Sequence, residues 1–190
     1  MFAVVVHWRA IVIKGHVDLS FVTEEMLFNL DFTESSEVSH GNGLWEELGV
    51  KQPNFNTSNT RVWQMFDSLC PPWANKVKRM FNWIDYSTVT INKLEPGTFI
   101  PTHSDTLYRL KQHVKEQNID TQNYRFVRIN IFLQNRYPGH FLDIDNVAIS
   151  QYNKGDYVII SPGVLHTVAN LGWTNRYTMQ ITGITTKKEI

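Results

Sequence analysis

Alternation of apolar and polar residues in the second half of the chain is the feature that most restricts how it can fold. From residue 127 to residue 133, Val, Ile, Ile and Leu occupy every second position, with Arg128 and Asn130 between them. Side chains of a β-strand point alternately to its two faces, so this segment predicts a strand with one apolar and one polar face. Residues 88–92 and 176–181 follow the same pattern. The polar faces could look at solvent, as in many antiparallel sheets, or line a pocket inside a barrel that holds an anion through Arg128 and Arg176.

Turn-forming residues divide the chain after residue 85 into short segments. They cluster at 95–97, 138–139, 145–146, 154–156, 162–163 and 173–175. Strands that arrive about every ten residues are typical of an antiparallel sandwich or barrel. We therefore expect a mainly β fold with flanking helices.

The first 84 residues predict a different kind of structure, a strand with helices that support the sheet. Residues 2–13 are rich in Val and Ile and predict one or two strands, whereas the polar stretches 31–42 and 51–59 predict loops. The spacing of Val62, Met65, Phe66 and Leu69 predicts an amphipathic helix, and Pro72 is placed to begin a second helix that runs through Met80. With 190 residues, of which 42% are hydrophobic, we expect residues 1–190 to form a single domain.

Composition excludes some partners. Eighteen basic and eighteen acidic residues give a net charge of zero, and no basic run exceeds the pair at 187–188, so a nucleic-acid partner is not indicated. No apolar run approaches the ~18 residues of a membrane span. The single cysteine, Cys70, cannot form an internal disulfide, which favours a reducing, cytoplasmic setting with Cys70 as a small apolar filler.

The segment His103-Ser104-Asp105, followed by His166 and then by Arg176 ten residues later, carries the chemistry of the chain. Two imidazoles and one carboxylate can cover one face of an octahedral metal and leave the opposite face open, the pattern of non-haem Fe(II) oxygenases. The planar guanidinium of Arg176 suits the carboxylate of a dicarboxylate cosubstrate. We expect His103, Asp105 and His166 to bind the metal and to be catalytic.

Other interpretations of these residues remain open. Two imidazoles and a carboxylate also suit catalytic zinc, and a jelly-roll could serve as an isomerase or as a non-catalytic binding module. His16-Val17-Asp18 has the same spacing as the metal motif, but the next His is His40 and position 50 is a Val, so no partner His with a basic residue ten positions on follows at a useful separation. The histidines that lack partners at ligand spacing are expected at the surface or in packing; they are His7, His16, His40, His113 and His140.

Residues 89–105, with the sequence VTINKLEPGTFIPTHSD, resemble the PGT…H-x-D/G element of Fe(II)/2-oxoglutarate oxygenases. The closest likeness is to the aspartyl/asparaginyl β-hydroxylase branch. Segments 128–130, 154–156, 166–167 and 176–177 continue the same order, so the resemblance covers residues 85–182. It implies a double-stranded β-helix (jelly-roll, cupin-like) core that holds the metal site.

The resemblance also implies roles for the residues of this site. In the family, residues at the positions of His103 and His166 bind iron. Residues at the positions of Arg176 and Asn92 meet the distal carboxylate of 2-oxoglutarate, and those at Arg128 and Asn130 lie by its iron-bound end. Two features depart from the branch: Asp105 stands where the animal β-hydroxylase has Gly, and Asn92 and Asn130 replace the usual Ser and His.

The implied activity is that of an Fe(II)- and 2-oxoglutarate-dependent dioxygenase. Such an enzyme uses O2 to hydroxylate an unactivated C–H bond and releases succinate and CO2. The substrate is a small molecule or a peptidyl group, such as a peptidyl or free amino acid. Residues 108–118, within the stretch 106–123, are charged and compatible with a helix, and we expect them to form a cover beside the site.

Overall fold

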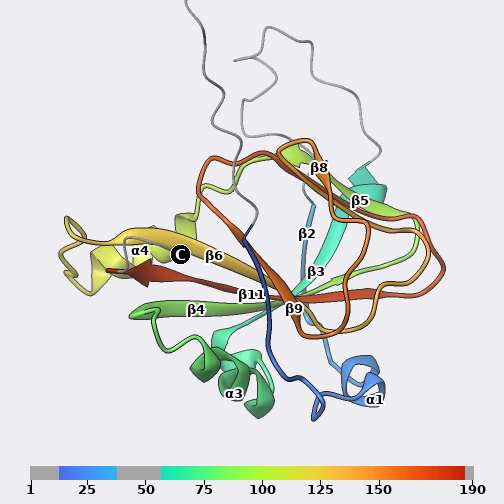
Figure 1. The fold of residues 1–190 in the computed structure, drawn as a ribbon, viewed down its shortest axis with the longest axis horizontal. Coiled ribbons are helices and arrows are strands. Elements are labelled where there is room, and N and C mark those ends of the chain that lie inside the picture. The colour runs from blue at the N-terminus through green and yellow to red at the C-terminus, as the bar shows by residue number, and fades with distance from the viewer. Residues whose placement is uncertain (1–12, 38–56, 187–190) are drawn as a thin grey trace, which may run out of the picture.

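The computed structural model describes residues 13–37 and 57–186, which form two antiparallel sheets with helices against the larger one (Figure 1). The larger, seven-stranded sheet has the order β1-β9-β6-β11-β4-β3-β2. Its strands are β1 (Ile13–His16), β9 (Asp156–Ile160), β6 (Arg125–Phe132), β11 (Arg176–Thr185), β4 (Tyr86–Leu94), β3 (Arg61–Phe66) and β2 (Glu34–Glu37).

The smaller, four-stranded sheet has the order β5-β10-β7-β8. Its strands are β5 (Thr98–His103), β10 (His166–Asn170), β7 (His140–Ile144) and β8 (Val147–Ala148). From β4 to β11 the chain passes back and forth between the sheets, so β4-β11-β6-β9 stands opposite β5-β10-β7-β8. This strand order is that of a double-stranded β-helix, and it confirms the predicted fold class.

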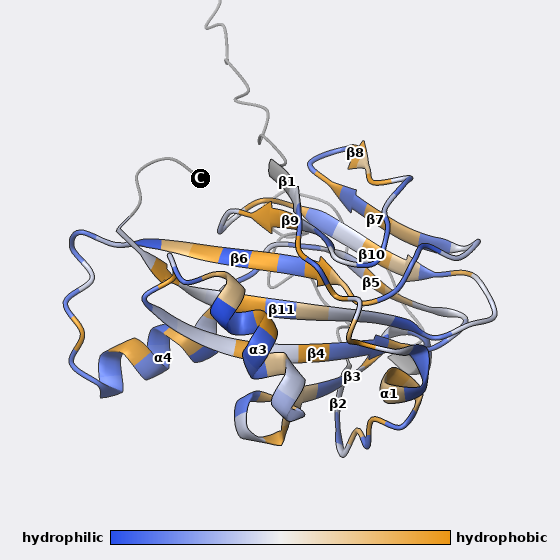
Figure 2. Cartoon of the chain, turned by 60° about the horizontal axis from the view of Figure 1, so that its bottom comes forward, coloured by the Kyte–Doolittle hydropathy of each residue, from blue (hydrophilic) through white to orange (hydrophobic). Residues whose placement is uncertain are grey.

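The main apolar core lies on the helix side of the larger sheet. Helices α1 (Glu24–Phe28) and α3 (Pro72–Met80) lie below this sheet in Figure 1, and Figure 2 shows α3 across β6, β11 and β4. The helices contribute the buried Leu27 and Val77. The strands contribute the apolar members of the alternating segments; these are Val89, Ile91, Val127, Ile129, Ile131, Leu133, Tyr177, Met179 and Ile181. The period-2 pattern therefore places one face of three neighbouring strands in the core.

The helix predicted from Val62 to Leu69 is wrong. Residues 61–66 form β3, which pairs with β2 and β4, and a short 3-10 helix, η2 (Asp67–Leu69), follows. Val62 and Met65 are both buried, but on opposite sides of the strand: Val62 lines a cavity between the sheets, whereas Met65 joins the main core. A strand buried on both faces has apolar residues three apart, and that spacing imitates a helix.

Other expectations for the front half have mixed outcomes. The second helix is confirmed, because α3 begins at Pro72 and ends at Met80. The predicted loop 31–42 is wrong in part, because it contains β2, which pairs with β3. The pairing is made by the backbone, so the polar side chains of β2 do not predict it. Of the predicted loop 51–59, residues 57–59 belong to the 3-10 helix η1 (Thr57–Thr60). Residues 2–12, 38–42 and 51–56 lie outside the described residues.

Helix α4 (Tyr108–Glu116) follows the candidate metal motif. Leu110 and Val114 are buried in a small cluster with Ile184 of β11, so the helix is held against the sheet. The predicted helical character of residues 108–118 is thereby confirmed up to Glu116. In the two described stretches, none of the helices combines the length and the apolar character that crossing a membrane requires.

Candidate metal centre

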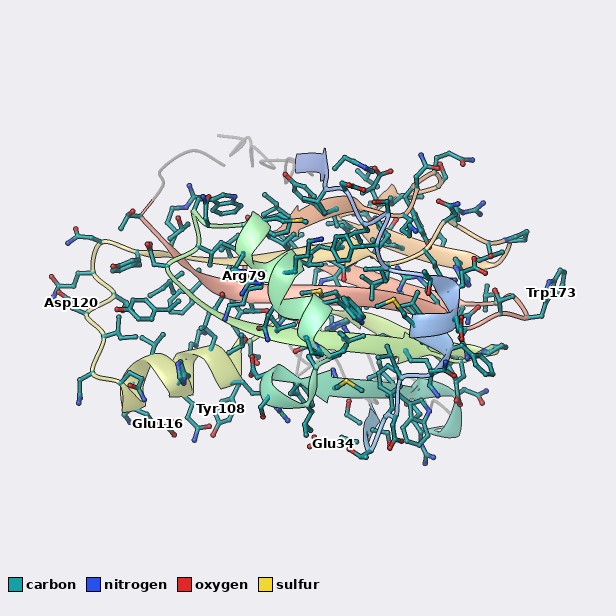
Figure 3. All side chains as sticks on the ribbon, turned by 90° about the horizontal axis from the view of Figure 1, so that it is seen from below. Glu34, Arg79, Tyr108, Glu116, Asp120 and Trp173 are labelled. Carbon is teal, nitrogen blue, oxygen red and sulfur yellow. The ribbon has the colours of Figure 1, made fainter. Side chains whose placement is uncertain are left out.

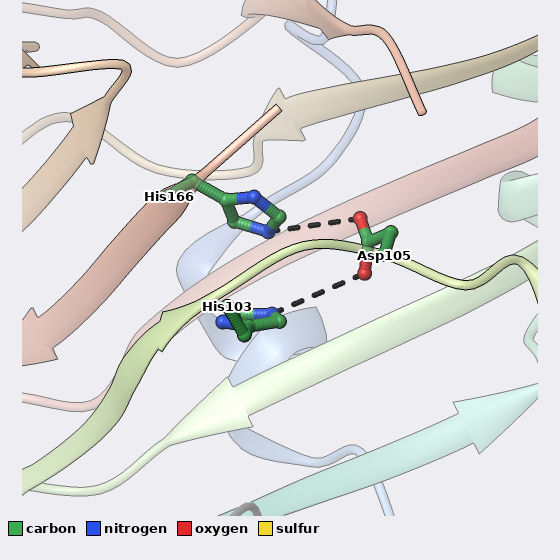
Figure 4. A group of neighbouring side chains, drawn as sticks. All are labelled: His103, Asp105 and His166. Atoms are coloured by element: carbon green, nitrogen blue, oxygen red, sulfur yellow. Dashed lines mark ion pairs between the residues drawn. The ribbon is translucent and has the colours of Figure 1, made fainter. Parts of the chain in front are cut away.

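The two histidines and the aspartate of the motif converge between the sheets (Figure 4). His103 ends β5, His166 begins β10, and the two residues face each other in the antiparallel register of these strands. Asp105 follows His103 by two residues and closes the triangle. One potential ligand atom from each lies within 4.8 Å of the others, and within residues 13–37 and 57–186 no other such group of His, Cys, Asp or Glu occurs.

The tautomer of each imidazole follows from its backbone contact. His103 Nδ1 lies 2.8 Å from the carbonyl oxygen of Pro101, and His166 Nδ1 lies 3.0 Å from that of Val164. A carbonyl oxygen only accepts, so both Nδ1 atoms carry the proton and donate it. Each Nε2 then keeps a free lone pair and faces Asp105, at 3.9 Å from Oδ1 for His103 and 3.6 Å from Oδ2 for His166. These separations are too long for hydrogen bonds, but they leave room for a cation between the groups.

The two carboxylate oxygens of Asp105 have different surroundings. Oδ1 accepts a charge-assisted bond from Arg128 at 2.5 Å, whereas Oδ2 is buried and has no hydrogen-bond partner among the described residues. A buried carboxylate oxygen without a partner is unfavourable, and a metal ion would supply the missing interaction. Burial also lowers the pKa of His166, which keeps its imidazole neutral and able to bind a metal. The donor set therefore fits a divalent metal ion with imidazole and carboxylate ligands.

A cavity of about 250 Å³ between the sheets contains the whole predicted site. All seven site residues predicted from the sequence line it; they are Asn92, His103, Asp105, Arg128, Asn130, His166 and Arg176. The polar faces of β4, β6 and β11 thus look, over part of their length, into this cavity and not at solvent. What each of the seven residues binds stays a prediction.

Arg176 presents unpaired donors inside this cavity. Its side chain is 4% exposed, and its Nε and NH2 atoms are buried without a hydrogen-bond partner in the described part of the chain. Burial lowers the pKa of the guanidinium, and the Tyr152 hydroxyl opposes that effect. A buried cation with unmet donors is costly unless an anion pairs with it, so Arg176 marks a place for an anionic group.

The front half contributes to the cavity in a way that the sequence did not reveal. The Gln64 side chain of β3 donates to Asn92 Oδ1 at 3.0 Å and accepts from the Ser36 hydroxyl of β2 at 2.8 Å. Ser36 and Gln64 both line the cavity. No sequence signal indicated them, because residues 62–69 were predicted as a helix and residues 31–42 as a loop. Thr178 also lines the cavity, and its place on the predicted polar face with Arg176 was the available signal.

A second cavity, of about 310 Å³, adjoins the first on the α4 side. The two share Gln64, Asp105, Arg128 and Gln180, and the first turn of α4 bounds the second. Leu107, buried just before α4, adopts a left-handed backbone with φ of 53°, which is strained for a bulky residue and is found at sites held by their surroundings. Residues 108–110 therefore form a wall next to the metal motif, and their role as a movable cover stays a prediction.

The histidines outside the motif take other roles. His16 pairs with Asp156 at 2.8 Å, and Asp18 accepts from the Ser20 backbone, so the 16–18 segment does not form a ligand set. His140 is buried, as expected of a packing residue. His113 is exposed on α4 and lines neither cavity, and His7 and His40 lie outside the described residues.

Cys70 is buried, and burial raises the pKa of its thiol to about 11. The thiol is therefore protonated near neutral pH, and its donor lies 3.4 Å from the Met65 carbonyl oxygen. These contacts agree with a packing role and not with a nucleophile or metal ligand.

Comparison with known proteins yields similarity of fold only. No protein-family model matches the chain, and no curated protein matches its sequence. Among solved structures, a prolyl-4-hydroxylase from Pseudomonas putida is 13% identical, covers 86% of this chain and 96% of its own, and has a TM-score of 0.44. A predicted oxalate decarboxylase from Thermotoga maritima is 14% identical over 65% of this chain and 81% of its own, with a TM-score of 0.39.

A cupin protein from Bacteroides fragilis is 18% identical over 56% of this chain and 72% of its own, with a TM-score of 0.37. These neighbours are cupin and double-stranded β-helix proteins. We base the fold assignment on the order of the strands, and the chemistry of the site on its own side chains.

Proposed function

We propose that this protein is an Fe(II)- and 2-oxoglutarate-dependent dioxygenase that hydroxylates an unactivated C–H bond. The observation that supports this most is that one cavity contains two sets of polar atoms that lack binding partners. The lone pairs of His103, Asp105 and His166 converge near one part of it, and Arg176, whose Nε and NH2 atoms have no hydrogen-bond partner among the described residues, lines it as well. A metal-binding jelly-roll with no dicarboxylate ligand has no need of that buried cation.

The residues of the cavity have different roles in this reaction. Fe(II), held by the three ligands, would supply the activation of O2, with 2-oxoglutarate oxidised to succinate and CO2 as the substrate gains a hydroxyl group. Arg176, with Asn92, binds the distal carboxylate of 2-oxoglutarate. Arg128 holds Asp105 Oδ1 in place, which leaves Oδ2 for the metal, and with Asn130 it lies beside the iron-bound end of the cosubstrate.

The finer assignment to the aspartyl/asparaginyl β-hydroxylase-like branch is also a proposal. It is supported by the sequence likeness of residues 85–182 and weakened by Asp105, which gives the chain a full set of three protein ligands. The substrate is a small molecule or a peptidyl group. The second cavity, which shares Asp105 and Arg128 with the first, is the place where its reacting carbon would approach the metal. Residues 1–190 act as one oxygenase domain in this proposal.

Binding of cosubstrate to the iron-loaded protein tests the proposal. Metal-free protein is loaded anaerobically with Fe(II), titrated with 2-oxoglutarate, and followed by the visible charge-transfer band of a chelated keto acid. We expect a saturable band with one equivalent each of iron and 2-oxoglutarate. Succinate, which lacks the keto group, is the matched control and should give no band. Iron binding without any band would refute the oxygenase proposal and favour another metal-binding jelly-roll.

A further inference from the structure

A separate surface cavity lies between α1 and the loop that joins β10 to β11. We call it the aromatic groove; it measures about 500 Å³ and is lined by Glu24, Glu25, Leu27, Phe28, Gln134, Tyr137, Trp173, Thr174, Asn175 and Tyr177. None of these residues lines either cavity at the metal motif. Tyr177 points away from the site, because it alternates with Arg176 along β11.

Two large aromatic side chains of the groove are almost fully exposed. Phe28, at the end of α1, is 79% exposed, and Trp173, in the β10–β11 loop, is 83% exposed. Figure 3 shows Trp173 projecting beyond the sheets at the end of the molecule where α1 lies. Tryptophan is among the residues that contribute most to binding when a partner covers it.

The floor of the groove is held by a hydrogen-bonded frame. Gln134 accepts from the Tyr177 backbone N–H at 3.1 Å and donates to the Asn175 carbonyl at 3.0 Å. The Asn175 amide donates to the Tyr177 hydroxyl at 3.2 Å. Leu27 below it is buried in the main core. A floor built in this way is pre-organised, which lowers the entropic cost of binding.

The charged side chains that line the groove are all acidic. Glu24 and Glu25 are its only ionisable carboxylates, and no Lys, Arg or His is among its described lining residues. The Tyr137 hydroxyl donates to Glu24 at 2.8 Å, and this bond, the largest contribution, raises the pKa of Tyr137. The faces of Phe, Tyr and Trp rings also carry a partial negative charge, so four aromatic residues and two carboxylates together attract a cation.

We propose that the aromatic groove binds an arginine or lysine side chain of a partner polypeptide, with the apolar neighbours of that residue packed on Phe28 and Trp173. The carboxylates pair with the cation, and the rings offer cation–π contacts. A peptide fits better than a small ammonium ion, because the groove is open, exceeds the size of one side chain and has two exposed rings at its rim. This surface is independent of the proposed oxygenase chemistry.

Direct binding measurements test this proposal. The probes are three fluorescently labelled peptides that differ at one central position between leucines, with arginine, neutral citrulline of nearly the same shape, or glutamate there. Anisotropy is followed with the 190-residue protein at physiological salt. We expect the arginine peptide to bind at least about tenfold more tightly than the citrulline peptide, and the glutamate peptide not to bind.

Variants show where the peptide binds. Trp173→Ala and the double change Glu24→Gln, Glu25→Gln should each weaken the arginine peptide about tenfold, and Trp173→Phe, which keeps an aromatic face, should weaken it less. Glu116→Gln is the matched control, because Glu116 lies on α4 at the opposite end of the molecule from Trp173 (Figure 3). It should leave the affinity within about twofold.

Three outcomes would overturn the proposal: no binding of the arginine peptide at about 1 mM, equal binding of the arginine and citrulline peptides, or unchanged affinity in Trp173→Ala. Thermal unfolding of each variant shows whether a loss of binding reflects a loss of fold. Because Trp173 is 83% exposed, Trp173→Ala should unfold at the wild-type temperature.

Discussion

The two faces of β4, β6 and β11 both contain buried side chains but do opposite things for the protein. On the helix side, Ile129, Met179 and Ile181 are each 0% exposed and pack in the main core. On the cavity side, Asn130 is 5% and Arg176 is 4% exposed. Burial of the apolar face stabilises the fold, whereas burial of polar groups without partners costs free energy. The cavity face therefore lowers the stability of the fold and provides the polar groups for binding.

This comparison predicts which substitutions affect stability and which affect function. A change on the helix side should unfold the domain and leave the chemistry of the surviving protein intact. A change on the cavity side should remove metal or cosubstrate with little loss of stability.

Removal of a proposed metal ligand should have the largest effect. His166→Ala removes one of the converging Nε2 atoms, so we expect loss of iron and no measurable turnover, while the metal-free protein unfolds near the wild-type temperature. Iron content by elemental analysis and succinate release measure both. His16→Ala is the control from the motif of the same spacing, and it should keep its iron. Wild-type turnover with full iron in His166→Ala would show that the ligand assignment is wrong.

Neighbouring residues on the two faces of β6 provide the sharpest contrast. Ile129→Ala should lower the free energy of unfolding by about 2–5 kcal/mol, because it leaves a cavity in the main core. Asn130→Ala, one residue along, should change it by less than about 1 kcal/mol and weaken 2-oxoglutarate binding. Urea unfolding and cosubstrate titration distinguish the two. If Asn130→Ala proved the more destabilising of the pair, the assignment of stability to the helix-side face and of binding to the cavity face would be wrong.

Removal of the buried cation should weaken cosubstrate binding in a graded way. Arg176→Ala should keep iron but bind 2-oxoglutarate about 2–5 kcal/mol less tightly, the loss typical when one member of a buried charge pair is removed. Arg176→Lys should recover only part of this, because an ammonium cannot reproduce two parallel N–H bonds from one planar group. Anaerobic titration of the charge-transfer band measures both variants. Unchanged affinity in Arg176→Ala would exclude it from the cosubstrate site.

The smallest effect concerns pH. Burial, with further contributions from Arg176 and Arg136, lowers the pKa of His140, whose Nδ1 lies 3.5 Å from the Tyr152 hydroxyl. In the unfolded chain the His140 imidazole is protonated below pH of about 6.5. In the folded protein it is protonated only at lower pH. The contribution of His140 to stability is therefore fully present above pH 6.5 and is lost progressively as the pH drops below it. His140→Asn should flatten this dependence in urea unfolding between pH 7.5 and 5.5, and an unchanged slope would contradict the assignment.

The strands of the second half could be predicted because their pattern is local. In residues 127–133 every second side chain is apolar, and the structure buries those residues in the core and turns Arg128 and Asn130 toward the cavity. The H-x-D motif was also visible, because β5 and its following loop carry both residues within three positions. In contrast, β3 was predicted as a helix, because both of its faces are buried. The spacing of Val62 and Met65 does not show that one side chain faces the cavity and the other the main core.

The sequence by itself determined the mainly β fold, the alternating faces of β4, β6 and β11, and the residue types of the candidate metal set. These depend on local spacing, which the period of a strand converts into faces. Only the tertiary structure decided that the polar faces enclose a cavity and that Gln64 and Ser36 of the front half line it. It also decided that Asp105 Oδ2 and the Nε and NH2 atoms of Arg176 have no hydrogen-bond partner among the described residues. These features depend on the pairing of strands that are far apart in the chain, and pairing is set by the packing of the whole core and not by any one segment.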